Sequence, residues 1–204
     1  MGAEHDRFAR VGKFYDDLVS QYGHDPRACD YGRPESQRSK FEVLAAVTNL
    51  NDRSILDVGC GFADYSTFLK ERFSRIKYSG IDLSDQMVES ALHLHPGIDV
   101  RKANILDLVG GRTYDVVTAN GIFYLLGDEA WPMMCRLIEV MFSLATRAVA
   151  FNSLSTWASD RESHEFYADP STALAFCRTL TPWVVCRHDY HSRDFTIYLY
   201  RDRV

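Results

Sequence analysis

Hydrophobic and polar residues follow two alternating periods along this chain of 204 residues. Segments in which apolar residues recur every three or four positions separate short, mostly apolar runs, and the two patterns are typical of helices and strands. They predict helices at residues 6–22, 35–49, 63–73, 84–95 and 129–144, and strands at residues 53–58, 76–82, 98–102, 114–119 and 147–151. Strands that alternate with helices in this way predict a parallel sheet with helices on both faces.

The end of the chain departs from this alternation. Residues 183–190 and 195–200 are both rich in β-branched and aromatic residues, and only residues 191–194 lie between them. This gap is too short for the crossover helix that joins parallel strands. The two runs are therefore expected to pair as an antiparallel hairpin.

A glycine turn follows the strand predicted at residues 53–58. Asp57 stands two residues before Gly59, and Gly61 completes the Gly-x-Gly pattern. Glycine lets the backbone turn sharply and approach a ligand closely, and the helix that follows directs unpaired N–H groups at the same place. The next predicted strand also ends in an acid, Asp82, at the spacing of dinucleotide-binding folds.

These segments resemble motifs I and II of the class I S-adenosylmethionine (SAM) methyltransferases. The resemblance continues through residues 102–108 and 114–121, in the order that the family has. It implies an α/β fold with a Rossmann-like, doubly wound, seven-stranded sheet, mostly parallel, with an antiparallel C-terminal β-hairpin and a helical N-terminal cap. A simple dinucleotide-binding domain has no such hairpin. The chain is then one domain, 1–204, with the cap at 1–50, the SAM-binding core at 51–151, and the acceptor-side segment and closing hairpin at 152–204.

The resemblance also implies SAM as the cofactor and S-adenosylhomocysteine (SAH) as the product. In the family the motif I acid lies close to the amino-acid end of the cofactor and the motif II acid binds both ribose hydroxyls, and these roles fall to Asp57 and Asp82. The other implied cofactor-binding positions are Gly59, Cys60, Gly61, Leu83, Met87, Asn104, Ile105 and Asn120. Two alternatives stay open, because Asn104 could only shape a turn, and Met87 and Ile105 could be plain core residues.

The acceptor site is expected among the loops and the N-terminal helices. The substrate-binding candidates are Phe123, Tyr124, Asn152, Trp157 and Tyr167, with Ser153, Ser155, Tyr15, Tyr22, Tyr31, Gln37, Arg38, Tyr190 and His191 as further possibilities. His164 and His188 are the catalytic candidates, since an imidazole titrates near neutrality and can act as a general base. The alternative for both is an ordinary surface or packing histidine.

A second resemblance spans nearly the whole chain. Residues 35–44, 121–123, 150–156, 167–170 and 187–190 look like a widespread group of small bacterial methyltransferases that act on small molecules. The expected function is transfer of a methyl group from SAM to an oxygen or nitrogen of a small-molecule metabolite. The alternatives are a catalytically silent SAM-fold protein with a binding or regulatory role, and a nicotinamide-dependent oxidoreductase.

Composition narrows the expected partners. The formal net charge is −5 and no run is rich in Lys or Arg, which disfavours a nucleic-acid partner. The cysteines number five and show no Cys-x-x-Cys spacing, so we expect reduced thiols in a cytoplasmic protein. No metal-ligand spacing, signal peptide or membrane-spanning run is recognisable in the sequence. A monomer and a homodimer are both compatible with these features.

Overall fold

The computed structural model describes residues 2–29 and 34–203 of the chain. All the predicted helices and strands are present, with ends that differ by a few residues. The helices are α1 (Gly2–Tyr22), α2 (Pro34–Ala45), α3 (Asp64–Lys70), α4 (Asp85–Leu94), α5 (Ala130–Leu144) and α6 (Pro170–Leu180), with short 3₁₀ helices η1 (Pro26–Cys29) and η2 (Ile105–Leu108). The strands are β1 (Ser54–Val58), β2 (Lys77–Asp82), β3 (Asp99–Lys102), β4 (Tyr114–Ala119), β5 (Ala145–Leu154), β6 (Val184–Arg187) and β7 (Asp194–Tyr200). None of the helices in the described ranges combines the length and the apolar character needed to cross a bilayer.

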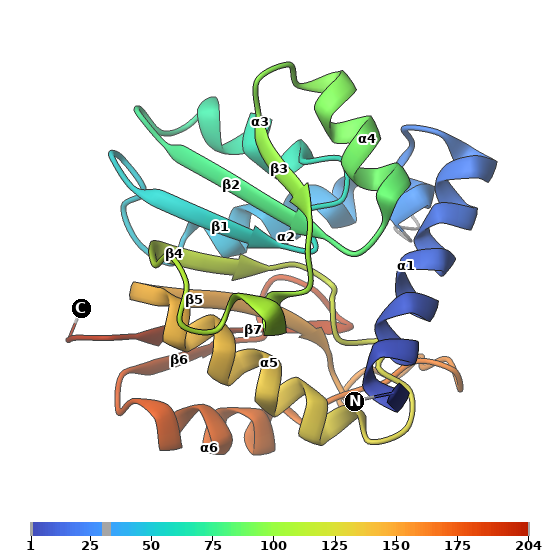
Figure 1. Ribbon diagram of the computed structural model, residues 1–204. Coiled ribbons are helices and arrows are strands. Elements are labelled where there is room, and N and C mark those ends of the chain that lie inside the picture. Colours follow the sequence, from blue (N-terminus) through green and yellow to red (C-terminus); the bar gives the residue numbers. More distant parts are fainter. Residues whose placement is uncertain (1, 30–33, 204) are drawn as a thin grey trace.

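The strands of the described residues form one sheet in the order β3-β2-β1-β4-β5-β7-β6 (Figure 1). β1 to β5 run parallel, and β7 lies antiparallel between β5 and β6. The predicted seven-stranded, mostly parallel sheet with an antiparallel C-terminal hairpin is therefore confirmed. Strand order reverses between β1 and β4, and open α/β sheets bind their ligands beyond the carboxyl ends of the strands at such a point.

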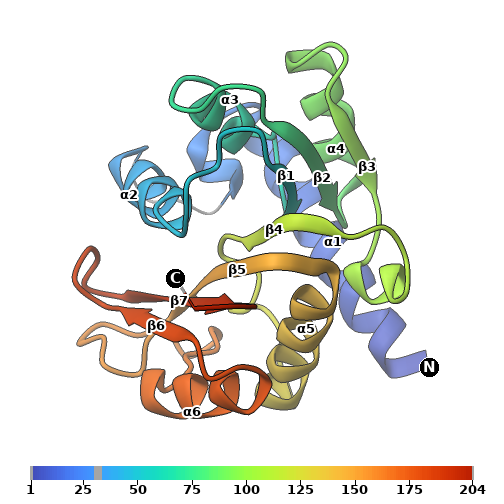
Figure 2. The same ribbon diagram turned by 90° about the vertical axis from the view of Figure 1, so that its left-hand side faces the viewer.

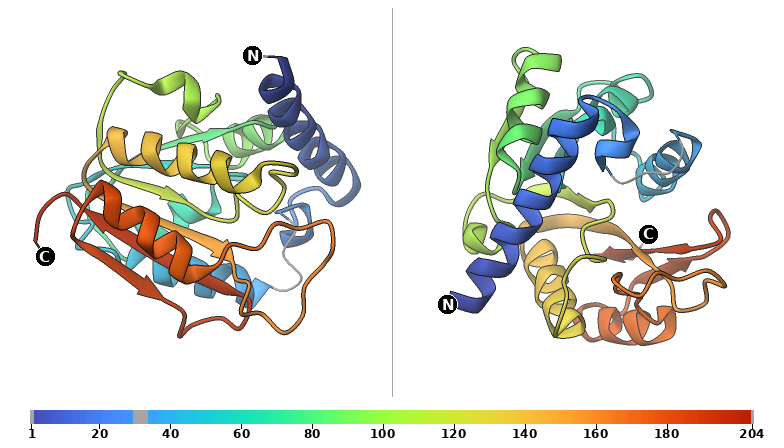
Figure 3. Two further views of the ribbon diagram at one scale, coloured as in Figure 1. Left: turned by 90° about the horizontal axis from the view of Figure 1, so that it is seen from below. Right: turned by 90° about the vertical axis from the view of Figure 1, so that its right-hand side faces the viewer.

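The central strands supply side chains to an apolar layer on each face of the sheet. Leu56 and Val117 pack in the layer that holds α5 and α6, which lie side by side in Figure 3. Ile55 and Val116 pack in the layer of α2, α3 and α4, and Figure 2 shows α2 and α3 on the opposite side of the sheet from α5. Because successive strand residues point to opposite faces, Asp57 lies on the α2 side of β1.

The helix α6 is missing from the sequence-based prediction. Asp169 caps it, since its side chain accepts the Thr172 N–H at 2.8 Å, and Pro170 stands in its first turn. A capping acid followed by proline is a helix start signal, and this pair was the signal available in the sequence.

The N-terminal helix α1 lies across the carboxyl ends of the parallel strands (Figure 1). Phe8, Gly12 and Val19 on one side of the helix are buried. The hydroxyl groups of Tyr15 and Tyr124 lie 2.7 Å apart, which connects α1 to the loop after β4. The helical cap predicted at the N-terminus therefore covers the edge of the sheet at which a ligand is expected.

Gly12 sets how closely α1 approaches the loop after β2. A Cβ at this position would lie 2.8 Å from the Leu83 carbonyl oxygen, which belongs to the backbone and cannot turn away. Alanine is favoured over glycine in a helix by about 1 kcal/mol, whereas overpacking costs about 1–3 kcal/mol. We therefore expect Gly12→Ala to lower the free energy of unfolding by about 1 kcal/mol in urea denaturation. Lys13→Ala, on the exposed side of the same turn, is the control, and a Gly12→Ala protein more stable than wild type would contradict the close contact.

Candidate active site

A cavity opens at the carboxyl ends of β1, β2 and β4 and continues toward β5 and the start of β7. Residues of α1 and α2, including Phe8, Tyr15, Ser36 and Lys40, form walls opposite the strand ends. All the cofactor-binding positions implied by the sequence line this cavity, namely Asp57, Gly59, Cys60, Gly61, Asp82, Leu83, Met87, Asn104, Ile105 and Asn120. The fold thus brings residues from four separate segments of the chain to one place.

The glycine turn after β1 needs both of its glycines. Gly59 has a φ of +70° and Gly61 a φ of +52°, in the left-handed region that side chains disfavour. A Cβ on Gly59 would also lie 2.5 Å from Ile122 Cγ2. The N–H groups of Gly59 and Cys60 donate to the Ile81 carbonyl oxygen at 2.8 and 3.0 Å, which binds the turn to β2.

Asp82 ends β2 and faces the cavity with 8% of its surface exposed. Its Oδ2 accepts the Gly61 N–H at 2.8 Å, and its Oδ1 accepts the Ser84 N–H at 2.9 Å. Burial raises the pKa of Asp82 above its ordinary value, although the N–H donors of Ser84, Gly61 and Leu83 work in the opposite direction. A carboxylate has about four lone-pair sites, so Asp82 can hold both N–H groups and still accept hydrogen bonds from a ligand.

Asp57 lies deeper, beneath the glycine turn. Its Oδ2 accepts the Tyr78 hydroxyl at 2.7 Å, and its Oδ1 accepts the Thr118 hydroxyl at 3.2 Å. Burial raises the pKa of Asp57 to about 7, and the hydrogen bonds from Tyr78 and Thr118 oppose this shift. Asp57 therefore lines the cavity with a carboxyl group that can gain or lose its proton near neutral pH.

The remaining cofactor positions combine packing with exposure to the cavity. Asn104 Oδ1 accepts the Leu106 N–H at 3.0 Å and begins η2, so the side chain shapes a turn while the residue also lines the cavity. Met87 and Ile105 are buried core residues that present part of their surface to the same cavity. These features fit SAM. The buried carboxylate suits the ribose hydroxyls, the glycine turn lets the ligand approach the backbone, and the two apolar side chains suit the adenine.

The structure separates the predicted acceptor residues into two groups. Phe123 and Tyr124 line the cavity. Asn152 is fully buried and accepts the Gly121 N–H at 2.7 Å, so it holds the loop after β4 in place. Trp157 is 59% exposed, and Tyr167 is connected to the cavity through its hydrogen bonds to Glu165 and Arg193, which both line it.

The two histidines predicted as catalytic candidates are not among the described residues that line the cavity. His164 is exposed. His188 Nε2 lies 2.8 Å from Ser155 Oγ, and its ring stacks with Trp157 at 5.3 Å between centroids. Among the further possibilities, Tyr15, Gln37, Ser153 and His191 do line the cavity, and Tyr31 lies outside the described residues.

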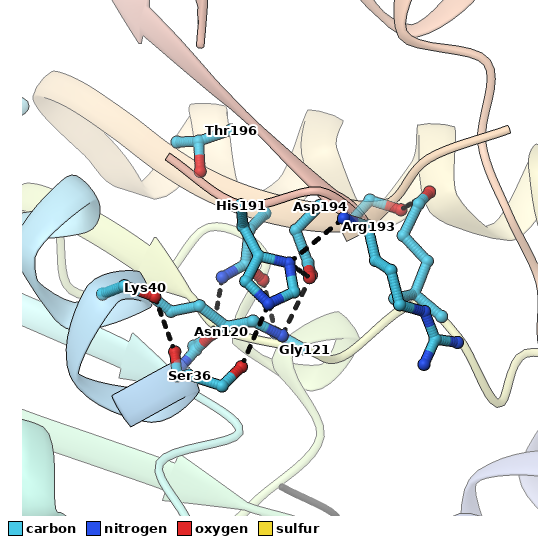
Figure 4. A network of polar contacts seen from close by, with 12 residues as sticks. Ser36, Lys40, Asn120, Gly121, His191, Arg193, Asp194 and Thr196 are labelled. Atoms are coloured by element: carbon cyan, nitrogen blue, oxygen red, sulfur yellow. Dashed lines mark hydrogen bonds and ion pairs between the residues drawn. The ribbon is translucent and has the colours of Figure 1, made fainter. Parts of the chain in front are cut away.

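A charged group at the β5 and β7 end of the cavity contains residues that sequence reasoning missed. The Lys40 ammonium lies 3.0 Å from Asp194 Oδ1, and His191 Nδ1 lies 2.7 Å from Asp194 Oδ2. Arg193 Nη2 lies 2.8 Å from Glu165 Oε2. Figure 4 shows Ser36 and Lys40, from α2, facing His191, from the hairpin turn, and Asp194, the first residue of β7. The available signal was the His191-x-x-Asp194 spacing. It lies inside the predicted hairpin turn, and the sequence pattern predicts that segment only as a connection between two strands.

Within the described residues no group of three or more His, Cys, Asp or Glu side chains is placed to hold a metal ion. All five cysteines lie in those residues and carry free thiols, and burial raises the pKa of each one, for example that of Cys29 to about 12.

Comparison with known proteins relates this arrangement to methyltransferases. A family described as a methyltransferase domain matches residues 55–142, from β1 into α5. A putative methyltransferase of Mycobacterium tuberculosis is 30% identical over 154 residues, which cover 71% of this chain and 90% of that protein. The trans-aconitate 2-methyltransferase of Acidovorax ebreus is 35% identical over 109 residues, and the match covers 52% of this chain and 42% of the enzyme.

Solved structures share the fold over the whole length. The magnesium protoporphyrin IX methyltransferase of Synechocystis, solved with bound SAH, superposes with a TM-score of 0.67 at 17% identity, over 97% of each chain. The plantazolicin methyltransferase BpumL, solved with SAH and a triazolic desmethylPZN analogue, superposes with a TM-score of 0.68 at 14% identity, over 99% of this chain and 98% of that one.

We expect Asp82→Asn to weaken the binding of SAH in calorimetric titration. The amide is neutral, and its NH₂ group would face the N–H of either Gly61 or Ser84. Loss of a hydrogen bond to a charged group costs about 1.5–3 kcal/mol, or roughly 10- to 100-fold in Kd. Asp85→Asn, the next acid along and exposed on α4, is the matched control. Equal affinity of wild type and Asp82→Asn would exclude the carboxylate from the binding of the ligand.

The raised pKa of Asp57 predicts that the free energy of unfolding depends on pH. Between its ordinary value of 3.8 and about 7, the folded protein holds a proton at Asp57 that the unfolded chain has released. Since the folded state binds more protons in this window, the contribution of Asp57 to the free energy of unfolding falls as the pH rises. Asp57→Asn removes this contribution, so the free energy of unfolding of the variant minus that of wild type should increase from about pH 4.5 to about pH 7.5 in urea denaturation. A difference that stays constant over this range would contradict the raised pKa.

Proposed function

The chain belongs to the class I S-adenosylmethionine-dependent methyltransferase family, and we propose that it transfers a methyl group to an oxygen or nitrogen atom of a small molecule. Membership follows from the relative that the chain matches over 90% of its length and from the shared fold. The chain is thus an enzyme of methyl transfer, which replaces the nicotinamide-dependent alternative. The acceptor and its reacting atom are the subject of the proposal.

We assign cofactor binding to the residues around the glycine turn. Asp82 would accept both ribose hydroxyls, a charge-assisted pairing that is stronger than a neutral one. The backbone at Gly59 and Gly61 allows close approach, and Asp57 supports the amino-acid end of the cofactor. Met87 and Ile105 would contact the adenine faces and Asn104 its edge, with Asn120 near the donor sulfur.

A small acceptor is supported by the burial of the polar groups at the far end of the cavity. The side chains of Lys40 and Asp194 are 10% and 3% exposed, and both line the cavity. A compound that enters the cavity can reach them directly, whereas a folded macromolecule would have to insert a side chain or nucleotide into the cavity. The names of several relatives also state small acceptors, among them trans-aconitate and magnesium protoporphyrin IX.

When bound, the cofactor supplies an electrophilic methyl group on a sulfonium sulfur. The protein then has to align the acceptor, exclude water and, for a protic acceptor, remove a proton. Alignment alone can contribute about 7–11 kcal/mol, and a positioned general base adds roughly 10²- to 10⁴-fold in rate. The cavity between α1, α2 and the strand ends would meet the first two requirements, because an acceptor inside it would lie beside the residues assigned to the cofactor.

We also propose a cytoplasmic enzyme without a nucleic-acid partner, as a monomer or a homodimer. The free thiols of the cysteines support a reducing compartment. The net charge of −5 supports the absence of a nucleic-acid partner.

The proposal predicts transfer of label from methyl-labelled SAM to small acceptors. The purified protein would be incubated with a panel of small hydroxyl, amino and carboxyl compounds that includes trans-aconitate, beside separate samples of RNA and protein. We expect labelled product among the small hydroxyl or amino compounds and its loss in Asp82→Ala. Label in RNA or protein, or SAH binding with no transfer to any sample, would contradict the proposed function.

A further inference from the structure

We propose that His191 is the general base of this enzyme and that its acceptor is a hydroxyl group. The proposal rests on the proposed function, because it assumes methyl transfer at this cavity. It commits to a protic oxygen, since a carboxylate acceptor is already ionised near neutral pH and needs no base.

The position of His191 follows from the insertion of β7 into the sheet. His191 lies in the turn between β6 and β7, and β7 pairs with β5. This brings the imidazole to the same cavity as Asp82 and Gly61, at the end away from those residues, with the loop of Asn120 to Tyr124 between. A base at this end faces the place where an acceptor must lie once the cofactor occupies the β1 and β2 side.

The Asp194 carboxylate favours the tautomer that a base requires. Nδ1 lies 2.7 Å from Asp194 Oδ2, a buried oxygen that has no aligned hydrogen-bond donor among the described residues. A buried carboxylate oxygen without a donor is costly, so a proton on the adjacent Nδ1 is favoured. The Arg193 backbone N–H donates to Nδ1 at 3.2 Å, and this neutral hydrogen bond would have to give way to the charge-assisted one. With the proton on Nδ1, Nε2 carries the lone pair.

The neighbours of Asp194 keep its carboxyl group ionised. Burial alone would raise its pKa, but His191 and the Lys40 ammonium together hold the pKa of Asp194 below its ordinary value. Its side chain is 3% exposed, whereas that of His191 is 24% exposed and lines the cavity. Asp194 is thus a positioning residue, which orients the ring and stabilises the imidazolium that forms.

The atoms around Nε2 favour a hydroxyl acceptor over an ammonium acceptor. Ser36 Oγ lies 3.3 Å from Nε2, so a hydroxyl group already fits beside this nitrogen. The Lys40 ammonium lies 3.0 Å from the other oxygen of Asp194. Because Asp194 is already paired with this cation, little negative charge remains to attract a cationic acceptor, whereas a neutral hydroxyl group needs no such partner.

The step balances without a further reactant. Nε2 takes the proton of the acceptor hydroxyl, and the acceptor oxygen uses the electron pair to bond the methyl carbon. The carbon–sulfur bond breaks, and its electron pair stays on sulfur, which leaves the thioether SAH. The imidazolium of His191 then returns its proton to water.

Two measurements test the proposal, and the first needs no acceptor. Long-range ¹H–¹⁵N correlation spectra of the SAH-bound protein report which ring nitrogen of each neutral histidine carries the proton. We expect Nδ1–H for His191 in wild type and a shift toward Nε2–H in Asp194→Asn. A wild-type His191 protonated on Nε2 would overturn the proposal. Thermal unfolding of Asp194→Asn would show whether loss of the buried partner of Lys40 disturbs the fold.

The second measurement uses His191→Gln, which keeps a polar side chain of similar size and leaves Asp194 in place. With labelled SAM and the hydroxyl members of the panel, its rate should fall by roughly 10²- to 10⁴-fold, whereas its affinity for SAH should stay within about twofold of wild type. His93→Gln, on the exposed face of α4, is the matched control. An equal rate in His191→Gln, loss of activity in His188→Gln alone, or methylation of trans-aconitate with no hydroxyl compound accepting would each overturn the proposal.

Different results would contradict the proposed function and the assignment of His191 as the base. Wild-type protein that does not bind SAH would contradict the proposed function, whatever the tautomer of His191. Wild-type protein that binds SAH and methylates a hydroxyl compound equally well without His191 would leave the proposed function standing and remove only the base.

Discussion

The carboxylate of Asp82 holds together the two segments that form the cofactor end of the cavity. It accepts the N–H groups of Gly61 and Ser84, so the turn after β1 and the first turn of α4 are fixed to one group. An isolated buried carboxylate would be costly, and these N–H donors are what make it tolerable. Because the lone pairs of the carboxylate exceed these two donors, the same charge can serve the architecture and the binding of a ligand. The position of α1 depends on this corner as well, since Gly12 packs against the Leu83 carbonyl beside it.

The pleat of the sheet explains why polar residues gather on the α2 side of the strand ends. Asp57 pairs with Thr118 across β1 and β4, and Asn152, two residues beyond the partner of Thr118 on β5, pairs with Thr196 on β7. Each is buried, and each has a hydrogen-bond partner, as when Thr118 donates to Asp57 or Asn152 accepts from Gly121. The opposite face of the same strands packs in the apolar layer of α5 and α6. At the strand ends, the side of α5 thus stays apolar while the side of α2 supplies a polar floor beneath the cavity.

The acceptor end of the cavity has a different electrostatic character. Lys40, His191 and Asp194 come from α2, the hairpin turn and β7, and a single carboxylate neutralises the ammonium group while it contacts the imidazole. Buried ion pairs contribute little to stability because desolvation offsets the attraction between the charges. Their retention in a cavity is better explained by what they do to a bound molecule. Arg193 and Glu165 form a second pair on the same wall, so a molecule bound there would meet oriented charges rather than an apolar surface.

The sequence by itself determined the sheet and the closing hairpin, and it pointed to candidate cofactor residues that the fold gathers in one cavity. Local patterns encode these features, because hydrophobic period, glycine turns and strand-end acids such as Asp57 and Asp82 are read within a few neighbouring residues. Asp169 and Pro170 are a local signal for the start of α6, but a prediction from hydrophobic periodicity does not use them. Only the tertiary structure decided the acceptor end. His164 and His188 look as suitable as His191 in the sequence, since all three are histidines in the last quarter of the chain, yet only His191 reaches the cavity. The reason is that β7 inserts beside β5, which brings Asp194 to Lys40, a residue far away along the chain, and no local pattern records a contact of that range.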